Sequence, residues 1–197
     1  MTAAPGAPWS GPVAADPAVP GVICTPLPRY TDDRGWLLKV FQRSALLDAG
    51  SDAGVGEMFL SCSAKGTIRG LHFQVPPHDH AKTVVCVTGS VLDVVVDLRR
   101  GSPTEGRAAR FQLDARSPAQ LHVPAGVAHG FQALADDTVV AYVVSSEHAP
   151  DHDRGIHWDS AGIAWPLPPM HVSPRDQAHP PLDQFRSPFR YQGPSDG

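Results

Sequence analysis

The sequence has few cysteines and no long apolar run, and each shortage excludes a class of protein. Its 197 residues include only three cysteines, which lie far apart and show no Cys-x-x-Cys spacing. This usage favours unpaired thiols in a reducing compartment, so we expect a cytoplasmic protein. No segment approaches ~18 uninterrupted apolar residues, and the N-terminus lacks a basic region followed by an apolar run. We therefore expect neither a membrane-spanning helix nor an export signal.

Charge is also scarce: 18% of the residues are charged and the net charge is −4. No block of like charges appears, so the sequence carries no footprint of nucleic-acid or membrane-surface binding. What it does contain is 42% hydrophobic residues, enough for one domain with a real core. We predict a flexible leader rich in Ala, Pro and Gly at residues 1–20, a single domain at 21–185 and a C-terminal tail at 186–197.

Most of the chain reads as short β-rich runs bounded by Gly, Pro and Asp. Even spacing of that kind predicts a sandwich or small barrel rather than βαβ units. We expect one short helix, around residues 44–49, and a mostly irregular wrap after residue 146. The predicted strands are 22–27, 36–41 after a turn at 30–35, 57–63, 67–74, 83–88, 90–98, 107–113, 120–123, 129–135 and 139–145.

The stretch from Gly66 to Lys82 has the highest density of functional groups, and His72 is its centre. In a strand, His72 points away from the face of its two neighbours and can look into a barrel mouth. An imidazole that titrates near neutrality is a suitable base for removing a proton next to a carbonyl, provided that a carboxylate orients its second nitrogen. A hydrogen-bonded structural histidine is the alternative.

Cationic side chains near this stretch suit an anionic ligand. Lys82 would lie near the same mouth if its strand pairs close to that of His72, and a fixed ammonium there stabilises an enolate oxygen. A solvated strand end is its alternative. Arg34 and Arg69 suit bidentate phosphate recognition, with surface salt bridges as the alternative.

Tyr142 lies in an apolar strand and shares a face with Val140 and Val144. A tyrosine in that position is either a core residue or an acid. As an acid, its phenol can deliver a proton to the face of a carbanion opposite the base.

Three other histidines raise a metal hypothesis, because cupin-type barrels bind metals through a His-x-His pair, a later Glu and a distant His. His78-x-His80 supplies the pair, and Pro124-Ala-Gly-Val-Ala-His129 fits the second cupin signature. The first signature fails, because Lys82 stands where metal-binding members carry the Glu. A cation there opposes metal binding, so we predict no functional metal and expect His129 to be a buried or substrate-contacting residue.

Taken in order, motifs from about residue 22 to residue 180 resemble the dTDP-4-dehydrorhamnose 3,5-epimerases. They are Asp33-Arg-Gly35, Ile68-Arg-Gly-Leu-His-Phe73, Lys82, Gly89-Ser-Val-Leu-Asp-Val-Val-Val-Asp-Leu-Arg99 followed by Gly101-Ser-Pro, Pro124-Ala-Gly-Val-Ala-His-Gly-Phe131, Tyr142, Pro150, Arg154-Gly-Ile-His-Trp-Asp159, Trp165-Pro166 and Ser173-Pro-Arg-Asp176.

The resemblance implies a mainly β fold: a cupin-superfamily jelly-roll barrel with few short helices, in a homodimer without metal or cofactor. It also implies inversion of C3, C5 or both in a nucleotide-linked 4-keto-6-deoxyhexose, in deoxysugar biosynthesis. The implied roles are His72 as base oriented by Asp176, Tyr142 as acid on the opposite face, Lys82 with Arg69 at the enolate, and Arg34 at the nucleotide diphosphate from the partner subunit.

Two segments depart from the family's usual motifs. The family has Phe-x-Glu after its Arg-Gly, where this chain has Leu37-Leu-Lys39, and Gln-x-Asn-x-Ser where this chain has Glu57-Met-Phe-Leu-Ser61. These positions help to hold the nucleotide and sugar, so we expect Lys39, Glu57 and Ser61, with His129, to contact the substrate. His148 replaces a frequent second tyrosine, and its role stays unassigned.

Two other functions remain open from the sequence. One is a metal-dependent cupin oxygenase or isomerase. The other is a sugar-nucleotide-binding cupin without turnover, although retention of all five candidate catalytic residues argues against it. These are Arg69, His72, Lys82, Tyr142 and Asp176.

Overall fold

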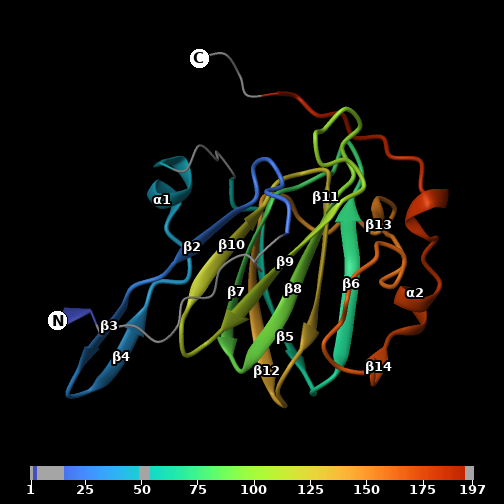
Figure 1. The fold of residues 1–197 in the computed structure, drawn as a ribbon. Coiled ribbons are helices and arrows are strands. Elements are labelled where there is room, and N and C mark those ends of the chain that lie inside the picture. The colour runs from blue at the N-terminus through green and yellow to red at the C-terminus, as the bar shows by residue number, and fades with distance from the viewer. Residues whose placement is uncertain (1, 4–15, 49–53, 194–197) are drawn as a thin grey trace.

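The structure is a computed structural model that describes residues 2–3, 16–48 and 54–193. Two sheets face each other and form a barrel (Figure 1). The first contains, in spatial order, β2 (Ile23–Pro26), β10 (Ala119–Val123), β7 (Lys82–Thr88), β12 (Thr138–Val144) and β5 (Glu57–Ser63). The second contains β13 (Asp153–Gly155), β6 (Thr67–Gln74), β11 (Val127–Ala133), β8 (Ser90–Asp97) and β9 (Ala108–Asp114), with β14 (His171–Val172) parallel to β6.

The main core lies between the two sheets and follows the period-2 alternation of the strands. In β8, Val91 and Val95 point inward and join the core with Phe131 of β11. Val94 and Val96 alternate with these residues and point to the outer face of the sheet. They too are buried, in a second cluster. An antiparallel sheet with one solvated face would show polar residues at these positions, so something must cover the outer face of β8.

The C-terminal segment provides that cover. Ile156, Ile163 and Phe189 pack against the outer face of the second sheet, and Figure 1 shows this part of the chain running along β6. It is mostly irregular, as predicted, but it contains α2 (Pro174–Gln177) and the 3₁₀ turn η1 (Leu182–Gln184). The C-terminal segment therefore covers the outer face of the second sheet and completes the second hydrophobic cluster.

A hairpin arm of β3 (Arg29–Asp32) and β4 (Gly35–Leu38) extends away from the barrel, with the short β1 (Thr2–Ala3) on its edge (Figure 1). The Asp32 carboxylate accepts a hydrogen bond from the Arg34 backbone N–H at 3.0 Å and so fixes the tight turn. Trp36 and Leu37 on β4 are largely exposed. The arm thus presents apolar side chains that its own barrel does not cover.

The predicted mainly β, cupin-like barrel with few short helices is confirmed, and most strand positions agree within two residues. The predicted turn at 30–35 was too long, because its first residues form β3 and only two residues turn the chain. The predicted second strand of this pair also ran too far, since β4 ends at residue 38. Helix α1 (Arg43–Asp48) matches the predicted helix, whose last residue lies outside the described ranges.

The predicted boundaries of the domain at residues 20 and 186 remain a prediction. Residues 1 and 4–15 of the expected leader lie outside the described residues. Thr2 and Ala3 pair with β3 in the arm. Residues 16–20 lie against the barrel: Val19 is buried in the main core, and Asp16 forms an ion pair with Arg110 at 2.8 Å. In the expected tail, Phe189 is buried.

Two further expectations concern the cysteines and the membrane. None of the three cysteines, all of which belong to the described ranges, forms a disulfide. Among the described residues, no helix is long and apolar enough to cross a membrane.

Candidate functional site

A cavity of about 1060 Å³ is lined by both sheets and by the C-terminal segment. Strands β5, β7 and β12 contribute side chains from the first sheet, and β6 and β11 contribute from the second. Seven of the ten residues that the sequence singled out as catalytic or substrate-binding line this one cavity. They are Ser61, Arg69, His72, Lys82, His129, Tyr142 and Asp176.

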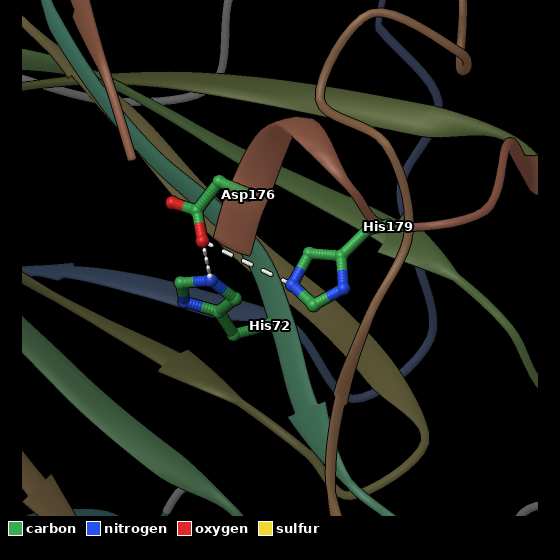
Figure 2. A group of neighbouring side chains, drawn as sticks. All are labelled: His72, Asp176 and His179. Carbon is green, nitrogen blue, oxygen red and sulfur yellow. Dashed lines mark hydrogen bonds and ion pairs between the residues drawn. The ribbon is translucent and has the colours of Figure 1, made fainter. Parts of the chain in front are cut away.

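His72 and Asp176 form a hydrogen-bonded pair on the cavity wall (Figure 2). The Nε2 atom of His72 lies 2.7 Å from Oδ1 of Asp176. Because an ionised carboxylate can only accept, the imidazole proton sits on Nε2 and the Nδ1 lone pair is left to act as a base. Burial opposes the charge of Asp176, but the hydrogen bond from His72 and further donors hold the pKa of Asp176 below its usual value.

Asp176 is fixed by the local structure of α2. Ser173 caps this helix by accepting a hydrogen bond from the Asp176 N–H at 3.1 Å, and Pro174 occupies the first helical turn. The second carboxylate oxygen accepts from the Gly70 N–H at 3.1 Å. The sequence analysis did not predict this helix, although serine followed by proline is a recognisable helix start.

Lys82 reaches the site from the opposite sheet. The strand pairing on which its predicted position depended is absent, because β7 pairs with β10 and β12 rather than with β6. The Lys82 ammonium instead crosses the space between the sheets and donates to the His72 carbonyl at 3.1 Å. Burial lowers the pKa of Lys82 to about 8, against the raising effect of nearby Asp153 and Asp93.

Tyr142 lies in β12, so it faces the cavity from the sheet opposite His72. Its ring stacks on Phe59 with centroids 4.6 Å apart. Burial raises the pKa of Tyr142 above its usual value, with Ser61 partly offsetting that rise. The phenol therefore keeps its proton at neutral pH and is available as an acid.

A second histidine–aspartate pair, His129 with Asp93, is buried between the sheets. The Nε2 atom of His129 is hydrogen-bonded to Oδ2 of Asp93 at 2.9 Å. Burial raises the pKa of Asp93 despite the opposing effects of His129 and Lys82. Asp93 lies within the strand predicted at residues 90–98, but its pairing with His129 was not predicted from the sequence. An acid within a valine run was the available signal, because a buried carboxylate needs a partner.

Arg69 is held at the cavity by the end of β5. Its Nε donates to the Ser63 hydroxyl at 3.0 Å, and its Nη2 donates to the Cys62 carbonyl at 3.0 Å. These two bonds orient the guanidinium while its remaining N–H groups stay available to a ligand.

Three predicted site residues lie elsewhere. Glu57 lines a smaller neighbouring cavity of about 130 Å³, and its carboxylate accepts from the His148 N–H at 2.9 Å. Arg34 and Lys39 are exposed on and beside the arm and line neither cavity. Arg34 forms an ion pair with Asp32 at 2.7 Å.

The cupin-type metal ligands do not gather. Burial lowers the pKa of His80 to about 4, and its Nδ1 lies 3.1 Å from the Gln74 amide. His78 instead contacts the His152 ring, with centroids 4.5 Å apart. Within the described ranges, the one group of three potential ligands is His72, Asp176 and His179 (Figure 2).

His179 was not singled out from the sequence. Its Nε2 lies 3.9 Å from the Asp176 carboxylate. Burial, followed by the nearby His72, lowers the pKa of His179, so the ring is neutral at neutral pH. A histidine in a proline-rich loop gave no sequence signal, because only the fold brings it beside Asp176 and His72.

Comparisons with known proteins point to one family of enzymes. A family model described as dTDP-4-dehydrorhamnose 3,5-epimerase matches residues 16–184. A dTDP-4-dehydrorhamnose 3,5-epimerase of Sinorhizobium fredii is 41% identical over 167 residues, which cover 83% of this chain and 86% of that protein.

Two solved structures are also similar. A dTDP-6-deoxy-D-glucose-3,5-epimerase from Legionella pneumophila, in complex with dTDP-4-keto-L-rhamnose, superposes with a TM-score of 0.84 at 29% identity, covering 93% of this chain and 99% of that one. A 3'-monoepimerase from Streptomyces bikiniensis, in complex with dTDP-quinovose, has a TM-score of 0.78 at 34% identity, covering 85% of this chain and 87% of that one.

Proposed function

Because the chain belongs to the dTDP-4-dehydrorhamnose 3,5-epimerase family, we propose that it is an epimerase acting on a dTDP-linked 4-keto-6-deoxyhexose in deoxysugar biosynthesis. It inverts C3, C5 or both, since both a 3,5-epimerase and a 3'-monoepimerase are similar to it. The observation that supports this chemistry best is the placement of the oriented His72 base and the protonated Tyr142 phenol on opposite walls of one cavity.

The reaction needs a base, an acid and a way to stabilise an enolate. Nδ1 of His72 takes the proton from the carbon next to the ketone, and the Asp176 carboxylate stabilises the imidazolium that forms. The electron pair moves onto the ketone oxygen, where the ammonium of Lys82 and the guanidinium of Arg69 stabilise the negative charge. Tyr142 then donates its proton to the opposite face of the carbon, which inverts the centre.

Substrate binding uses the rest of the cavity wall. Ser61 and His129 contact the sugar, and Glu57 and Lys39 act at the edges of the site. This assignment is supported for Ser61 and His129 by their position on the cavity wall. For Glu57 it is supported by the adjoining smaller cavity.

The protein acts as a homodimer in which the arm of one subunit reaches the cavity of the other. Two apolar surfaces support this: Trp36 and Leu37 on the arm, and Met58 and Leu60 on the edge strand β5, are all about half exposed. Exposed apolar residues that cluster on an edge strand are typical of an interface. In such a dimer Arg34 contacts the diphosphate of the partner's substrate.

The two alternatives gain nothing from the comparisons. The family model describes epimerases, and the two similar structures are epimerases. None of the proteins compared above is a metal-dependent oxygenase or a binding protein without turnover. The reaction as written needs neither metal nor cofactor. The composition supports a cytoplasmic location for it.

Proton exchange tests the function directly. The protein is incubated in D₂O with dTDP-4-keto-6-deoxyglucose, and NMR follows the signals at C3 and C5. Deuterium incorporation at one or both carbons is expected, and the pattern identifies which centre is inverted. Full retention of both protons at high enzyme concentration would reject the epimerase.

Mixed dimers test the role of Arg34. Arg34→Ala and His72→Ala are each expected to be weakly active alone. If Arg34 acts across the interface, random mixing restores one intact site per mixed dimer, or about a quarter of the wild-type activity. If no activity returns although mass spectrometry shows that subunits have exchanged, Arg34 does not act on the partner's site.

A further inference from the structure

His179 adds a third ligand-capable group to the His72–Asp176 pair (Figure 2). Its Nε2 lies 3.9 Å from Oδ1 of Asp176, and the ligand atoms of all three residues lie within 4.8 Å of one another. Among the described residues, the buried Nε2 of His179 has no hydrogen-bond partner. A buried polar atom without a partner is costly, and this one points at the carboxylate on which the base depends.

The fold holds His179 at this position. Gly155 of β13 pairs with His72 of β6, so it lies directly beside the base. A Cβ atom at residue 155 would lie only 2.4 Å from the His179 ring, which shows that the ring occupies the space over this glycine. The next residue is anchored too, because the Pro180 carbonyl accepts from the His157 N–H at 2.8 Å.

From this geometry we infer that His72, Asp176 and His179 form an inhibitory site for a divalent transition-metal ion of the zinc type. Two imidazoles and one carboxylate suit Zn²⁺ and its neighbours, whereas Mg²⁺ and Ca²⁺ prefer oxygen ligands. Two cations lie near the site: Arg175 forms an ion pair with Asp153 at 2.7 Å, and the Lys82 ammonium donates to the His72 carbonyl at 3.1 Å.

The site needs only a small adjustment to close on an ion. Zinc–nitrogen bonds of about 2.0–2.1 Å place tetrahedral ligand atoms about 3.4 Å apart. The widest separation between two ligand atoms of the group is at most 4.8 Å, so these two atoms must approach each other by at most about 1.4 Å. His179 lies in an irregular bend, where rotation of its side chain can supply this movement.

Metal binding would prevent His72 from accepting the substrate proton, because it changes the tautomer of the imidazole. Without metal, the proton of the neutral imidazole is on Nε2 and faces Asp176, so the Nδ1 lone pair can accept the substrate proton. An ion bound at Nε2 takes that position, and the single ring proton moves to Nδ1. The ring stays neutral, but the nitrogen that faces the reaction is blocked. This inhibition rests on the proposed epimerase function, whereas the binding of the ion does not.

Binding is tested first, without substrate. The full chain is freed of metal with a chelator, and Zn²⁺ affinity is measured by competition with a chromophoric chelator, with the d–d spectrum of Co²⁺ as a second readout. His179→Asn is expected to weaken Zn²⁺ binding by at least about tenfold and to change the Co²⁺ spectrum. His78→Ala is the matched control, because it removes the other close histidine pair and should leave the affinity unchanged.

Inhibition is then measured by deuterium exchange, with each variant compared with its own metal-free rate. Zn²⁺ is expected to inhibit the wild type reversibly, with Mg²⁺ inert, and His179→Asn should need at least about tenfold more Zn²⁺. His179→Gln serves if thermal melting shows that the asparagine variant is unfolded. Equal Zn²⁺ affinity in wild type and both His179 variants, or a loss confined to His78→Ala, would overturn the site. A wild type that binds Zn²⁺ through His179 but never exchanges deuterium would reject the epimerase and leave the site standing.

Discussion

The molecule contains two histidine–aspartate pairs with similar bond lengths and different surroundings. In the His72–Asp176 pair, the histidine side chain is 28% exposed and the bond is 2.7 Å. In the His129–Asp93 pair, the values are 4% and 2.9 Å. The first pair joins a barrel strand to the C-terminal segment, and the second joins two neighbouring strands. Both histidines are hydrogen-bonded to a carboxylate, so hydrogen bonding alone does not distinguish them; the exposure of the ring does.

The open pair is expected to carry the chemistry, so the largest effect should follow from His72→Ala. Loss of a general base typically lowers the rate by about 10²–10⁴-fold. Deuterium exchange at C3 and C5 measures this loss, and circular dichroism checks the fold. His129→Ala is the comparison: it should lower the free energy of unfolding more than His72→Ala does and lower kcat less. An unreduced exchange rate in His72→Ala would remove His72 as the base.

Lys82 is close to both pairs, and it tests whether the charge between them stabilises the enolate. Replacing it with Met keeps the length and removes the cation, which should lower kcat by about 10²–10³-fold. In the wild type, activity should fall as the pH rises through about 8, because the ammonium then loses its proton. Lys82→Met should lack this decline. A residual rate with the same alkaline decline would show that another group titrates.

Tyr142 contacts the buried pair, with its ring centroid 6.1 Å from that of His129, whereas we propose that it acts with the open pair. Tyr142→Phe keeps the ring on Phe59 and removes the acidic proton. Inversion should fall by about 10²-fold or more, while deuterium exchange by His72 continues on its own face. Comparing the rates of exchange and product formation by NMR separates the two steps. Equal losses in both would mean that the phenol also assists deprotonation.

The smallest expected effect is a difference in stability when the aspartate of each histidine–aspartate pair is replaced. Asp93→Asn changes a fully buried partner of His129 and should lower the free energy of unfolding by about 1–3 kcal/mol. Asp176→Asn should change stability less, because His72 can still reach water, but it should impair exchange. Urea denaturation and deuterium exchange measured on both variants complete the comparison. Equal stability losses would show that the open pair is also structural.

Much of this architecture was predictable because strand signals are local. The evenly spaced β-rich runs and the turn residues between them predicted a sandwich or small barrel, and His72, Lys82, Tyr142 and Asp176 were predicted as site residues from ordered motifs. Helix α2 was not predicted, although Ser173 and Pro174 form a recognisable helix start. The pairing of Asp93 with His129 was missed because it depends on which strands become neighbours.

The sequence by itself determined the β fold class, the family and the set of chemical groups, because alternation, turns and motif order are properties of neighbouring residues. Only the tertiary structure decided which histidine is the more exposed, that Lys82 arrives from the opposite sheet, and that His179 lies over Gly155 beside His72. The physical reason is that these contacts join residues far apart in the chain, and their distances are set by how the sheets and the C-terminal segment pack.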